Sequence, residues 1–461
     1  MPISRLLIAN RGEIAVRIQR AARELGIKTI QVHSAVDADS LAVHMADEAV
    51  NIGPFQVAKS YLNIEAVLAA AKATGADAIH PGYGFLSENP VFADAVEAAG
   101  LIFVGPKAET IRTMGDKAAA RGAAQRAGVP VVPGSDGRVA DLDEAVMLAE
   151  QIGFPIMIKA SAGGGGRGIR IAETVEALGA ALNQAAAEAK AAFGDAGLYL
   201  EKFIGNARHI EVQILGDGVD AIHCYERECS LQRRRQKVWE EAPASVLSRD
   251  VREALCASAV ALARSVNYRG AGTLEYLYDE ESRSFYFIEM NTRIQVEHPV
   301  TEMITGIDLV REMILIAGGE SLGYQQSDVR LRGHAIEVRI NAEDGERDFR
   351  PSPGKVTALQ APGGMGTRFD TLLYAGYTIL PFYDSLLGKL IVWDTSRETA
   401  LRRLRRALGE LKIDGIITTA PLLRRLVEAP EVRAGAFHTR WLEQWLMTTK
   451  PQDAMMEKSN R

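Results

Sequence analysis

The sequence predicts a mixed α/β protein of about three units, the first of which holds a parallel sheet. Three observations support this. The chain has 461 residues, which is too long for one ordinary hydrophobic core. It opens with a strand, a turn, a helix and a second strand, the βαβ order typical of parallel sheets. Further on, alternating apolar and polar runs predict half-exposed strands.

Composition restricts the function classes. Hydrophobic residues make up 47% and charged residues 24%, as in soluble globular proteins. A formal net charge of −6 argues against a nucleic-acid partner, and no apolar run is long enough to cross a membrane. A strand begins at once, so no signal or transit peptide is expected. The 3 cysteines form no CxxC pair, which favours a reducing compartment, and we expect a cytoplasmic protein.

The first unit begins with a buried strand at residues 6–9. A turn at 10–12 leads into a helix closed by Gly26, and the second strand spans 28–33. No GxGxxG fingerprint follows the first strand, so a nicotinamide cofactor is not indicated. A glycine-rich turn at 81–89 follows a further strand, where open α/β sheets bind ligands. A tight turn without a ligand fits equally well.

A smaller unit follows a helix that begins at Lys117 and an extended linker at 129–134. The strand at 154–160 carries Lys159 near its end, and four glycines follow in the loop 161–168. Such a loop can bring backbone N–H groups to phosphates, although a mobile hairpin is the alternative. It is not a P-loop, because no Lys-Ser or Lys-Thr pair opens a helix after it. The nearby cationic side chains favour phosphate binding.

The next strands carry charged residues. Residues 198–204 predict a strand, and 208–214 alternate like a half-exposed strand. The run 232–237 is strongly basic and precedes Glu240 and Glu241. Such a run is usually a solvated face. An anion site is the functional alternative, and nucleic acid is disfavoured because no aromatic residues interleave the charges.

The central stretch spans residues 285–302. It predicts a strand that presents Glu289 and Asn291 on one face, and the neighbouring strand-like run 273–277 carries Glu275. Two carboxylates and an amide oxygen suit a divalent cation bound with substrate phosphates. Solvated strand positions are the alternative. A short turn then carries Arg293, Gln295, Glu297 and His298. Later, the strand 333–344 places Glu337, Arg339 and Asn341 on one face, and a basic amphipathic helix spans about 399–411.

Taken together, these segments resemble the biotin carboxylases, a family within the ATP-grasp superfamily. The resemblance covers nearly the whole chain. It is specific, because the RIQVEH turn and the GHAIEVRINAED strand are not general ATP-grasp features. The matching segments are IANRGEIAVRI, HPGYGFLSEN, GPKAETI, MGDK, IKASAGGGGRG, EKFI, RHIEVQ, RGAGT, FYFIEMNTRIQVEHPVTE, GHAIEVRINAED, PSPGK, AGYT and IDGI.

The resemblance implies a multidomain α/β and α+β architecture with an ATP-grasp fold. The expected segments are a Rossmann-like N-terminal (pre-ATP-grasp) domain at 1–114, a linker helix and extended segment at 115–134, a small ATP-grasp lid with the glycine loop at 135–203, the metal-binding and C-terminal biotin carboxylase domain at 204–449, and a polar tail at 450–461.

The implied reaction uses ATP to activate bicarbonate as carboxyphosphate, which then carboxylates a ureido nitrogen of biotin. Mg²⁺ or Mn²⁺ is the implied metal, with a pair of ions expected. The chain contains no Met-Lys-Met biotinylation motif, so biotin is expected on a separate biotin carboxyl carrier protein. A carboxyltransferase elsewhere would choose the final acceptor, which the sequence leaves open. An acetyl-CoA carboxylase is the first expectation. Family members are commonly dimers, so we expect a homodimer.

The resemblance assigns ATP-binding roles by position. Lys117 and Lys159 would hold phosphates, with the glycine loop closing over them. The loop residues are Gly163, Gly164, Gly165 and Gly166. The remaining nucleotide contacts would be Glu201, Lys202 and Ile204 in the adenine pocket, Leu277 packing on the base, and His209 and Gln232 near the ribose.

It also assigns the reaction centre. Glu275 and Glu289 would bind the metal, aided by Asn291. The bicarbonate contacts would be Lys237, Arg293, Gln295 and the backbone at Val296. Glu297 would be the general base, because bicarbonate is a weak nucleophile until its proton is removed. Arg339 would stabilise the developing enolate-like oxygen of biotin, and its guanidinium offers paired donors that lysine lacks.

Two positions depart from the family pattern. Arg235 stands where several similar proteins carry His, so we assign it no role, and Ala162 replaces one glycine of the usual run. Two other functions remain open. One is another bicarbonate- or carboxylate-activating ATP-grasp ligase, similar to carbamoyl-phosphate synthetase. The other is a silent nucleotide-binding regulatory protein, which the presence of Glu297, Arg293 and the metal carboxylates disfavours.

Overall fold

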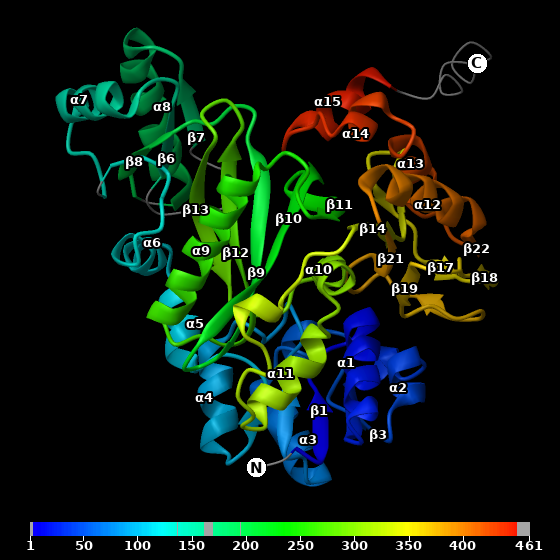
Figure 1. Cartoon of the computed structure of the whole chain (residues 1–461). Coiled ribbons are helices and arrows are strands. Elements are labelled where there is room, and N and C mark those ends of the chain that lie inside the picture. The colour runs from blue at the N-terminus through cyan, green and yellow to red at the C-terminus, as the bar shows by residue number, and fades with distance from the viewer. Residues whose placement is uncertain (1–2, 136, 161–168, 194, 450–461) are drawn as a thin grey trace. The chain divides into compact units, whose positions relative to one another are not determined.

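A computed structural model of the chain describes residues 3–135, 137–160, 169–193 and 195–449 (Figure 1). These residues form two compact units. The larger unit takes its residues from 1–129, 208–276 and 289–461, and the smaller unit from 130–207 and 277–288. The predicted segment boundaries at 114, 134, 203 and 449 stay predictions. The predicted phosphate loop Gly163–Gly166 lies outside the described residues.

The N-terminal part of the larger unit is a parallel sheet with strand order β3-β2-β1-β4-β5. Its strands are β1 (Arg5–Ile8), β2 (Lys28–His33), β3 (Glu48–Asn51), β4 (Ala78–His80) and β5 (Ile102–Phe103). The helices of this part are α1 (Gly12–Glu24), α2 (Leu41–Met45), α3 (Ile64–Thr74), α4 (Pro90–Ala98), α5 (Ala108–Gly115) and α6 (Lys117–Arg126), with short 3₁₀ turns η1 (Ala35–Asp37) and η2 (Val57–Lys59). The predicted βαβ opening is confirmed.

The residues of strand β1 show that this sheet is covered on both faces. Leu6 and Ile8 pack into one hydrophobic cluster with Ile14 and Ile18 of α1. Leu7, between them, points to the other face and packs into a second cluster. An uninterrupted apolar run is therefore needed, as is typical of strands buried on both sides.

The predicted glycine-rich turn after β4 is held by an asparagine from the turn after β1. Asn10 Nδ2 donates to the carbonyl oxygens of Pro81 and Tyr83, each at 2.7 Å. Gly82 has φ 64°, and a Cβ at this position would lie 2.8 Å from Asn10 Nδ2. Glycine is therefore required here, because both the backbone conformation and the close approach exclude a side chain.

An eight-stranded sheet has the order β13-β12-β9-β10-β11-β14-β21-β19. Its strands are β9 (Arg208–Asp217), β10 (Ala221–Arg233), β11 (Gln236–Ala242), β12 (Arg269–Asp279), β13 (Ser284–Asn291), β14 (His334–Asn341), β19 (Thr367–Thr371) and β21 (Leu386–Asp394). In the larger unit α9 packs on β9 and β10, α10 packs on β10, β11, β14 and β21, and α12 packs on β14 and β21.

The helices of this part are α9 (Arg249–Ser265), α10 (His298–Thr305), α11 (Leu309–Ala317), α12 (Arg397–Glu410), α13 (Ala420–Leu426), α14 (Pro430–Ala434) and α15 (Trp441–Thr448), with the 3₁₀ turn η3 (Gln326–Asp328). Three small antiparallel pairs complete it. They are β15 (Glu343–Asp344) with β16 (Arg350–Pro351), β17 (Gly354–Lys355) with β20 (Thr378–Ile379), and β18 (Ala358–Gln360) with β22 (Lys412–Asp414). The predicted basic helix is α12, whose Leu401, Leu404 and Leu408 are buried.

The prediction that β9 is half-exposed is wrong. Glu211 and Gln213, the polar residues of the alternation, are both 0% exposed. Alternation indicates two different faces, but it does not say that the polar face meets water. Here that face is buried against a charged partner, Arg227, which is also 0% exposed.

The smaller unit contains a three-stranded antiparallel sheet with order β7-β6-β8. Its elements are β6 (Ile156–Ala160), β7 (Ile169–Ala172), β8 (Leu198–Lys202), α7 (Leu142–Ile152) and α8 (Val175–Phe193). Ile156, Ile158 and Leu200 are 0% exposed in its core, so the predicted strands are confirmed. Across both units, the described residues include no helix long and apolar enough to span a membrane.

Candidate active site

A lysine lies at the centre of the charged side chains in the larger unit. Lys237 on β11 has three N–H donors, and each reaches a different carboxylate. Its Nζ lies 2.6 Å from Glu211 Oε2 on β9, 3.0 Å from Glu275 Oε1 on β12, and 2.6 Å from Glu297 Oε1. Glu297 is the residue before α10. These four residues are called the acid–base cluster below.

An arginine holds the other oxygen of Glu297. Arg339 on β14 donates from Nη2 to Glu297 Oε2 at 2.9 Å and from Nε to Glu240 Oε1 at 2.6 Å. Glu297 is 2% exposed and Glu240 is 0% exposed. Each oxygen of the predicted base therefore faces a cation in a setting from which water is largely excluded, where charge interactions are strong.

These contacts set the protonation states of the cluster. Burial alone raises the pKa of Glu297, but Lys237, Arg339 and Arg227 outweigh it and hold that pKa well below its usual range. Glu275 behaves in the same way, since Lys237 and His209 outweigh burial and its pKa is also well below the usual range. Burial lowers the pKa of Lys237, yet three carboxylates raise it well above its usual value. Both carboxyls are thus ionised and Lys237 is protonated at neutral pH.

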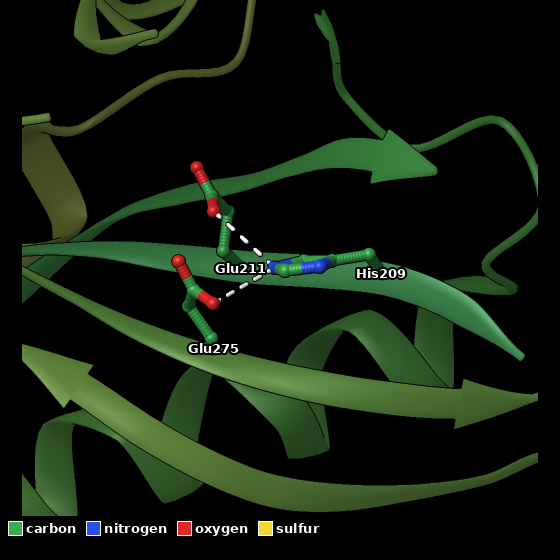
Figure 2. A group of neighbouring side chains, drawn as sticks. All are labelled: His209, Glu211 and Glu275. Atoms are coloured by element: carbon green, nitrogen blue, oxygen red, sulfur yellow. Dashed lines mark ion pairs between the residues drawn. The ribbon is translucent and has the colours of Figure 1, made fainter. Parts of the chain in front are cut away.

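Figure 2 shows His209 pointing between Glu211 and Glu275. Its Nε2 lies 3.1 Å from Glu275 Oε2 and 3.7 Å from Glu211 Oε2. These three residues are close enough to hold a metal ion, as are Glu211, Cys229 and Glu297. The second group is a poor metal site, because burial, with the charge of Glu211, raises the Cys229 pKa well above its usual value and keeps the thiol protonated.

The predicted metal ligands lie together on β12 and β13. Asn291 Nδ2 donates to Glu275 Oε1 at 2.9 Å. The pKa of Glu289 is raised by burial and by the charge of Glu275, and Lys117 at the start of α6 partly offsets this. An excess of buried negative charge on oxygen ligands fits a hard cation such as Mg²⁺. The donor chemistry therefore suits the metal, and the ligand roles stay predictions.

Arg227 on β10 is a further residue of the site, for which the sequence predicts no role. It is 0% exposed. Its hydrogen-bond acceptors are Glu211, Gln213 Oε1 at 2.7 Å, Gln295 Oε1 at 2.7 Å, Thr273 Oγ1 at 3.0 Å and Thr301 Oγ1 at 3.1 Å. A planar fork of donors that binds four different segments fixes their relative positions. The available signal was the charged triplet from Glu226 to Glu228, which lies in the middle of a strand.

The predicted bicarbonate contacts also lie beside the cluster. Gln295 Nε2 donates to Glu275 Oε1 at 2.8 Å. Arg293 donates from Nε to Glu88 Oε2 at 2.8 Å and from Nη2 to Asn291 Oδ1 at 2.8 Å. Glu88 belongs to the glycine-rich turn after β4, so this turn reaches the site. The Val296 carbonyl accepts a hydrogen bond from Lys389 Nζ at 2.9 Å, which fixes the turn before α10.

The predicted nucleotide contacts fall in both units. Lys117 and His209 belong to the larger unit, as does Gln232, which is paired with Lys237 across β10 and β11. The others belong to the smaller unit, where Lys159 forms an ion pair with Glu201. These are Lys159, Glu201, Lys202, Ile204 and Leu277. The nucleotide-binding roles of these residues therefore stay predictions.

The basic run forms the turn between β10 and β11. Arg234 and Arg235 have φ of 48° and 66°, as a tight hairpin turn requires, and both are exposed. Arg233 and Arg234 pair with Asp348. Most of the run is therefore a solvated, ion-paired face, while its last residue, Lys237, enters the acid–base cluster.

A pocket of about 150 Å³, open to solvent on one side, lies in the larger unit. It is lined by Asn10, Arg11, Gly12, Glu13, Tyr83, Gly84, Phe85, Asp384 and Leu386. Tyr83 donates its hydroxyl hydrogen to Glu13, and Glu13 pairs with Lys389 at 3.1 Å. The turn 81–89 contributes Tyr83, Gly84 and Phe85 to this pocket, and a ligand-binding role of the turn stays a prediction.

Three family models match the chain in succession. Residues 2–111 match "Biotin carboxylase, N-terminal domain", residues 116–325 match "Carbamoyl-phosphate synthase L chain, ATP binding domain", and residues 337–444 match "Biotin carboxylase C-terminal domain". Among curated relatives, biotin carboxylase of Haemophilus influenzae is 53% identical and aligns over 96% of this chain and 99% of its own. A pyruvate carboxylase subunit of Methanothermobacter thermautotrophicus is 48% identical, over 96% and 90%.

Solved structures agree with these matches. The biotin carboxylase domain of a thermophilic 2-oxoglutarate carboxylase bound to bicarbonate superimposes with a TM-score of 0.92 at 47% identity, covering 96% of this chain and 98% of that one. The corresponding domain dimer from Hydrogenobacter thermophilus, in complex with MgADP, ADP and bicarbonate, gives a TM-score of 0.86 at 48% identity, again over 96% and 98%.

Proposed function

The chain belongs to the biotin carboxylase family, and we propose that it uses ATP and bicarbonate to carboxylate biotin carried by a separate protein. The predicted family, the ATP-grasp fold with its biotin carboxylase N- and C-terminal domains, and the ATP-dependent ligase class are confirmed by matches over nearly the whole chain. The observation that carries the proposal is the position of Glu297, a buried carboxylate held between Lys237 and Arg339.

This arrangement suits deprotonation of a bound anion. Lys237, Arg293, Gln295 and the Val296 N–H would bind bicarbonate, and Glu297 would accept its proton. Before bicarbonate binds, the cations make Glu297 a weak base, because they hold its pKa well below the usual range. Bicarbonate would share the charge of Lys237, which raises the Glu297 pKa toward the range in which a carboxylate removes protons effectively.

We propose the metal and nucleotide contacts from the chemistry of the side chains and from their places in the fold. Mg²⁺ held by Glu275, Glu289 and Asn291 would neutralise charge on the ATP phosphates, and Mn²⁺ is the alternative ion. Lys117, His209 and Gln232 of the larger unit would contact ATP. The proposed contacts from the smaller unit and its loop are Lys159, Gly163, Gly164, Gly165, Gly166, Glu201, Lys202, Ile204 and Leu277. We propose residues 135–203 as the lid, since carboxyphosphate needs a site that excludes water.

Biotin is proposed to bind beside Arg339, with the pocket around Tyr83 and Asp384 as the place for its ring. Burial raises the pKa of Tyr83 well above its usual value, so its hydroxyl stays protonated and can donate a hydrogen bond. The guanidinium would stabilise the negative oxygen that develops on the ureido group.

The partners follow from this reaction. A biotin carboxyl carrier protein would present biotin, and a carboxyltransferase would use the product. The first expectation for the final acceptor is acetyl-CoA, but one relative is named as part of a pyruvate carboxylase. Because the acceptor does not enter this site, its identity is a property of the carboxyltransferase. We keep a cytoplasmic location as part of the proposal.

Phosphate release from ATP tests the function directly. With Mg²⁺ and bicarbonate, the wild-type protein should release phosphate faster when free biotin or a biotinylated carrier domain is added. ATP cleavage that requires bicarbonate but is not stimulated by biotin would indicate another ATP-grasp ligase. No cleavage under any condition would indicate a silent nucleotide-binding protein, and Arg235→His would then be the first reversion to examine.

We also propose that two copies of the chain form a dimer, as the similar domain of the Hydrogenobacter thermophilus 2-oxoglutarate carboxylase does. Size-exclusion chromatography with light scattering should give about twice the 50.0 kDa mass of the chain. A monomer mass at every concentration between micromolar and the highest soluble one would refute this.

A further inference from the structure

Two buried carboxyl groups near Arg339 have oxygens to which the proposed reaction gives no role. Glu240 on β11 and Glu337 on β14 are both 0% exposed. Glu240 Oε2 and both oxygens of Glu337 lack any hydrogen-bond partner among the described residues. Buried polar atoms are normally paired, so three such oxygens in one place need an explanation.

The strand register brings the two side chains together. Glu240 and Glu337 are direct partners in the antiparallel pairing of β11 and β14. Directly opposed residues have Cβ atoms about 4.5–5.5 Å apart, on the same face of the sheet. Arg339 lies two positions after Glu337 and therefore shares that face. Its Nε binds Glu240 Oε1, the oxygen of the pair that is already satisfied.

The cations near Glu337 already bind other groups. Arg339 donates hydrogen bonds to Glu240 and Glu297. Lys389 on β21, which is opposite Arg339, pairs with Glu13 of α1 at 3.1 Å and donates to the Val296 carbonyl. The charged groups that act on Glu337 are Lys389, Glu240, Arg339 and Glu297. Within the described part of the chain, an ionised Glu337 would have no hydrogen-bonded cation of its own, which is strongly unfavourable for a buried charge.

We propose that Glu337 is a positioning residue for the reaction. It holds one proton, which it shares with Glu240 on the neighbouring strand. Glu240 therefore stays negatively charged and orients Arg339 toward Glu297. The inference rests on the proposed function, in which Arg339 and Glu297 act on the substrates. The Glu337 hydroxyl would donate to Glu240 Oε2, which satisfies one unpartnered oxygen on each residue.

The electrostatics support this arrangement. Burial raises the pKa of Glu337 well above its usual value, and Glu240 and Glu297 raise it further against the opposing effects of Lys389 and Arg339. Burial also raises the pKa of Glu240 to about 7, although Arg339 opposes it. Two close carboxyls of this kind titrate as a pair, and the pair keeps one proton at neutral pH.

Loss of the proton shared by Glu240 and Glu337 should slow catalysis at high pH. When Glu337 ionises, a second negative charge appears beside Arg339. The guanidinium then divides its donors between Glu240, Glu337 and Glu297, and its orientation toward the substrates is lost. The rate of biotin carboxylation should therefore decline on the alkaline side as the pair loses its proton.

Infrared spectroscopy tests the proton without any assay of activity. At pH 7 the wild-type protein should show the carbonyl stretch of a protonated carboxyl that Glu337→Gln removes. Glu241→Gln serves as the matched control. Glu241 is a buried carboxyl of β11 whose pKa is held well below its usual range by Arg397 and His334, so it is ionised at pH 7 and its replacement should leave the band unchanged. A carboxyl band that is the same in Glu337→Gln and the wild type would overturn the proposal.

Kinetics test the positioning role. Glu337→Gln keeps a donor but cannot ionise, so the alkaline decline should disappear. Glu337→Leu has no donor, and its kcat should be about tenfold below that of Glu337→Gln, with the KM for ATP unchanged. Equal kcat values and an unchanged pH profile in both variants would refute the role. A wild-type protein that lacks bicarbonate-dependent ATP cleavage would instead refute the proposed function, and the infrared result would still decide whether the proton is shared.

Discussion

Replacing Glu297 with glutamine should lower bicarbonate-dependent ATP cleavage by about 10²–10⁴-fold, the range typical of a lost general base. Glutamine keeps the size and one acceptor oxygen of Glu297, but it cannot accept the bicarbonate proton. Lys237 and Arg339 contact different oxygens of Glu297, so the remaining acceptor still holds one of them in place. The measurement is phosphate release at saturating ATP and bicarbonate, with and without biotin.

The same charge change at an exposed site provides the control. Glu253 lies on α9, its side chain is 63% exposed, and it pairs with Arg249 one helical turn away. Glu253→Gln should therefore retain wild-type cleavage. Because Glu297 is buried, thermal unfolding of Glu297→Gln must show that the fold is intact. A folded Glu297→Gln protein that cleaves ATP within about threefold of the wild-type rate would exclude Glu297 as the base.

The acid side of the pH profile provides a second check on Glu297. Its folded-state pKa lies well below the usual range, so the carboxylate stays ionised as the pH falls through that range. By linkage, the stability that Glu297 contributes is present above its unfolded pKa and is lost only as pH falls through the lower folded value. Loss of kcat/KM between about pH 7 and pH 5 should therefore come from other groups.

Much of the site was predictable because strand alternation fixes which side chains share a face. Glu289 with Asn291, and Glu337 with Arg339, each lie two positions apart on a strand, and the structure has them on β13 and β14 as predicted. The turn from Arg293 to Glu297 was also predicted, since its polar side chains are dense and Pro299 follows. Such local rules need no knowledge of the partner strand.

The features that the sequence did not predict depend on contacts between residues that are distant in sequence. Alternation in β9 favoured a half-exposed strand, because Glu211 and Gln213 are polar. Their burial depends on Arg227, whose other acceptors come from β12, the turn before α10 and α10 itself. The pocket likewise joins the turns after β1 and β4 with Asp384. No local pattern contains the register that creates such contacts.

Arg227→Met should therefore have the largest effect on stability, lowering the free energy of unfolding by about 3–5 kcal/mol. Methionine fills similar space but leaves Glu211 and the amide and hydroxyl acceptors of Arg227 without their donors. Lys237 would still bind Glu211 Oε2, while Oε1 would become a buried, unpaired charge. Chemical denaturation of the variant and the wild type, followed by tryptophan fluorescence, measures the difference.

Arg249→Met is the matched control for this substitution. The Arg249 side chain is 86% exposed and pairs with Glu253 on the surface of α9, so its loss should leave the unfolding free energy close to the wild-type value. Arg227→Met should also lower bicarbonate-dependent cleavage in the molecules that remain folded, because Gln295 loses the partner that orients its amide beside Glu275. A destabilisation below about 1 kcal/mol would mean that the acceptors of Arg227 find other donors, and that this arginine does not fix the strands around the base.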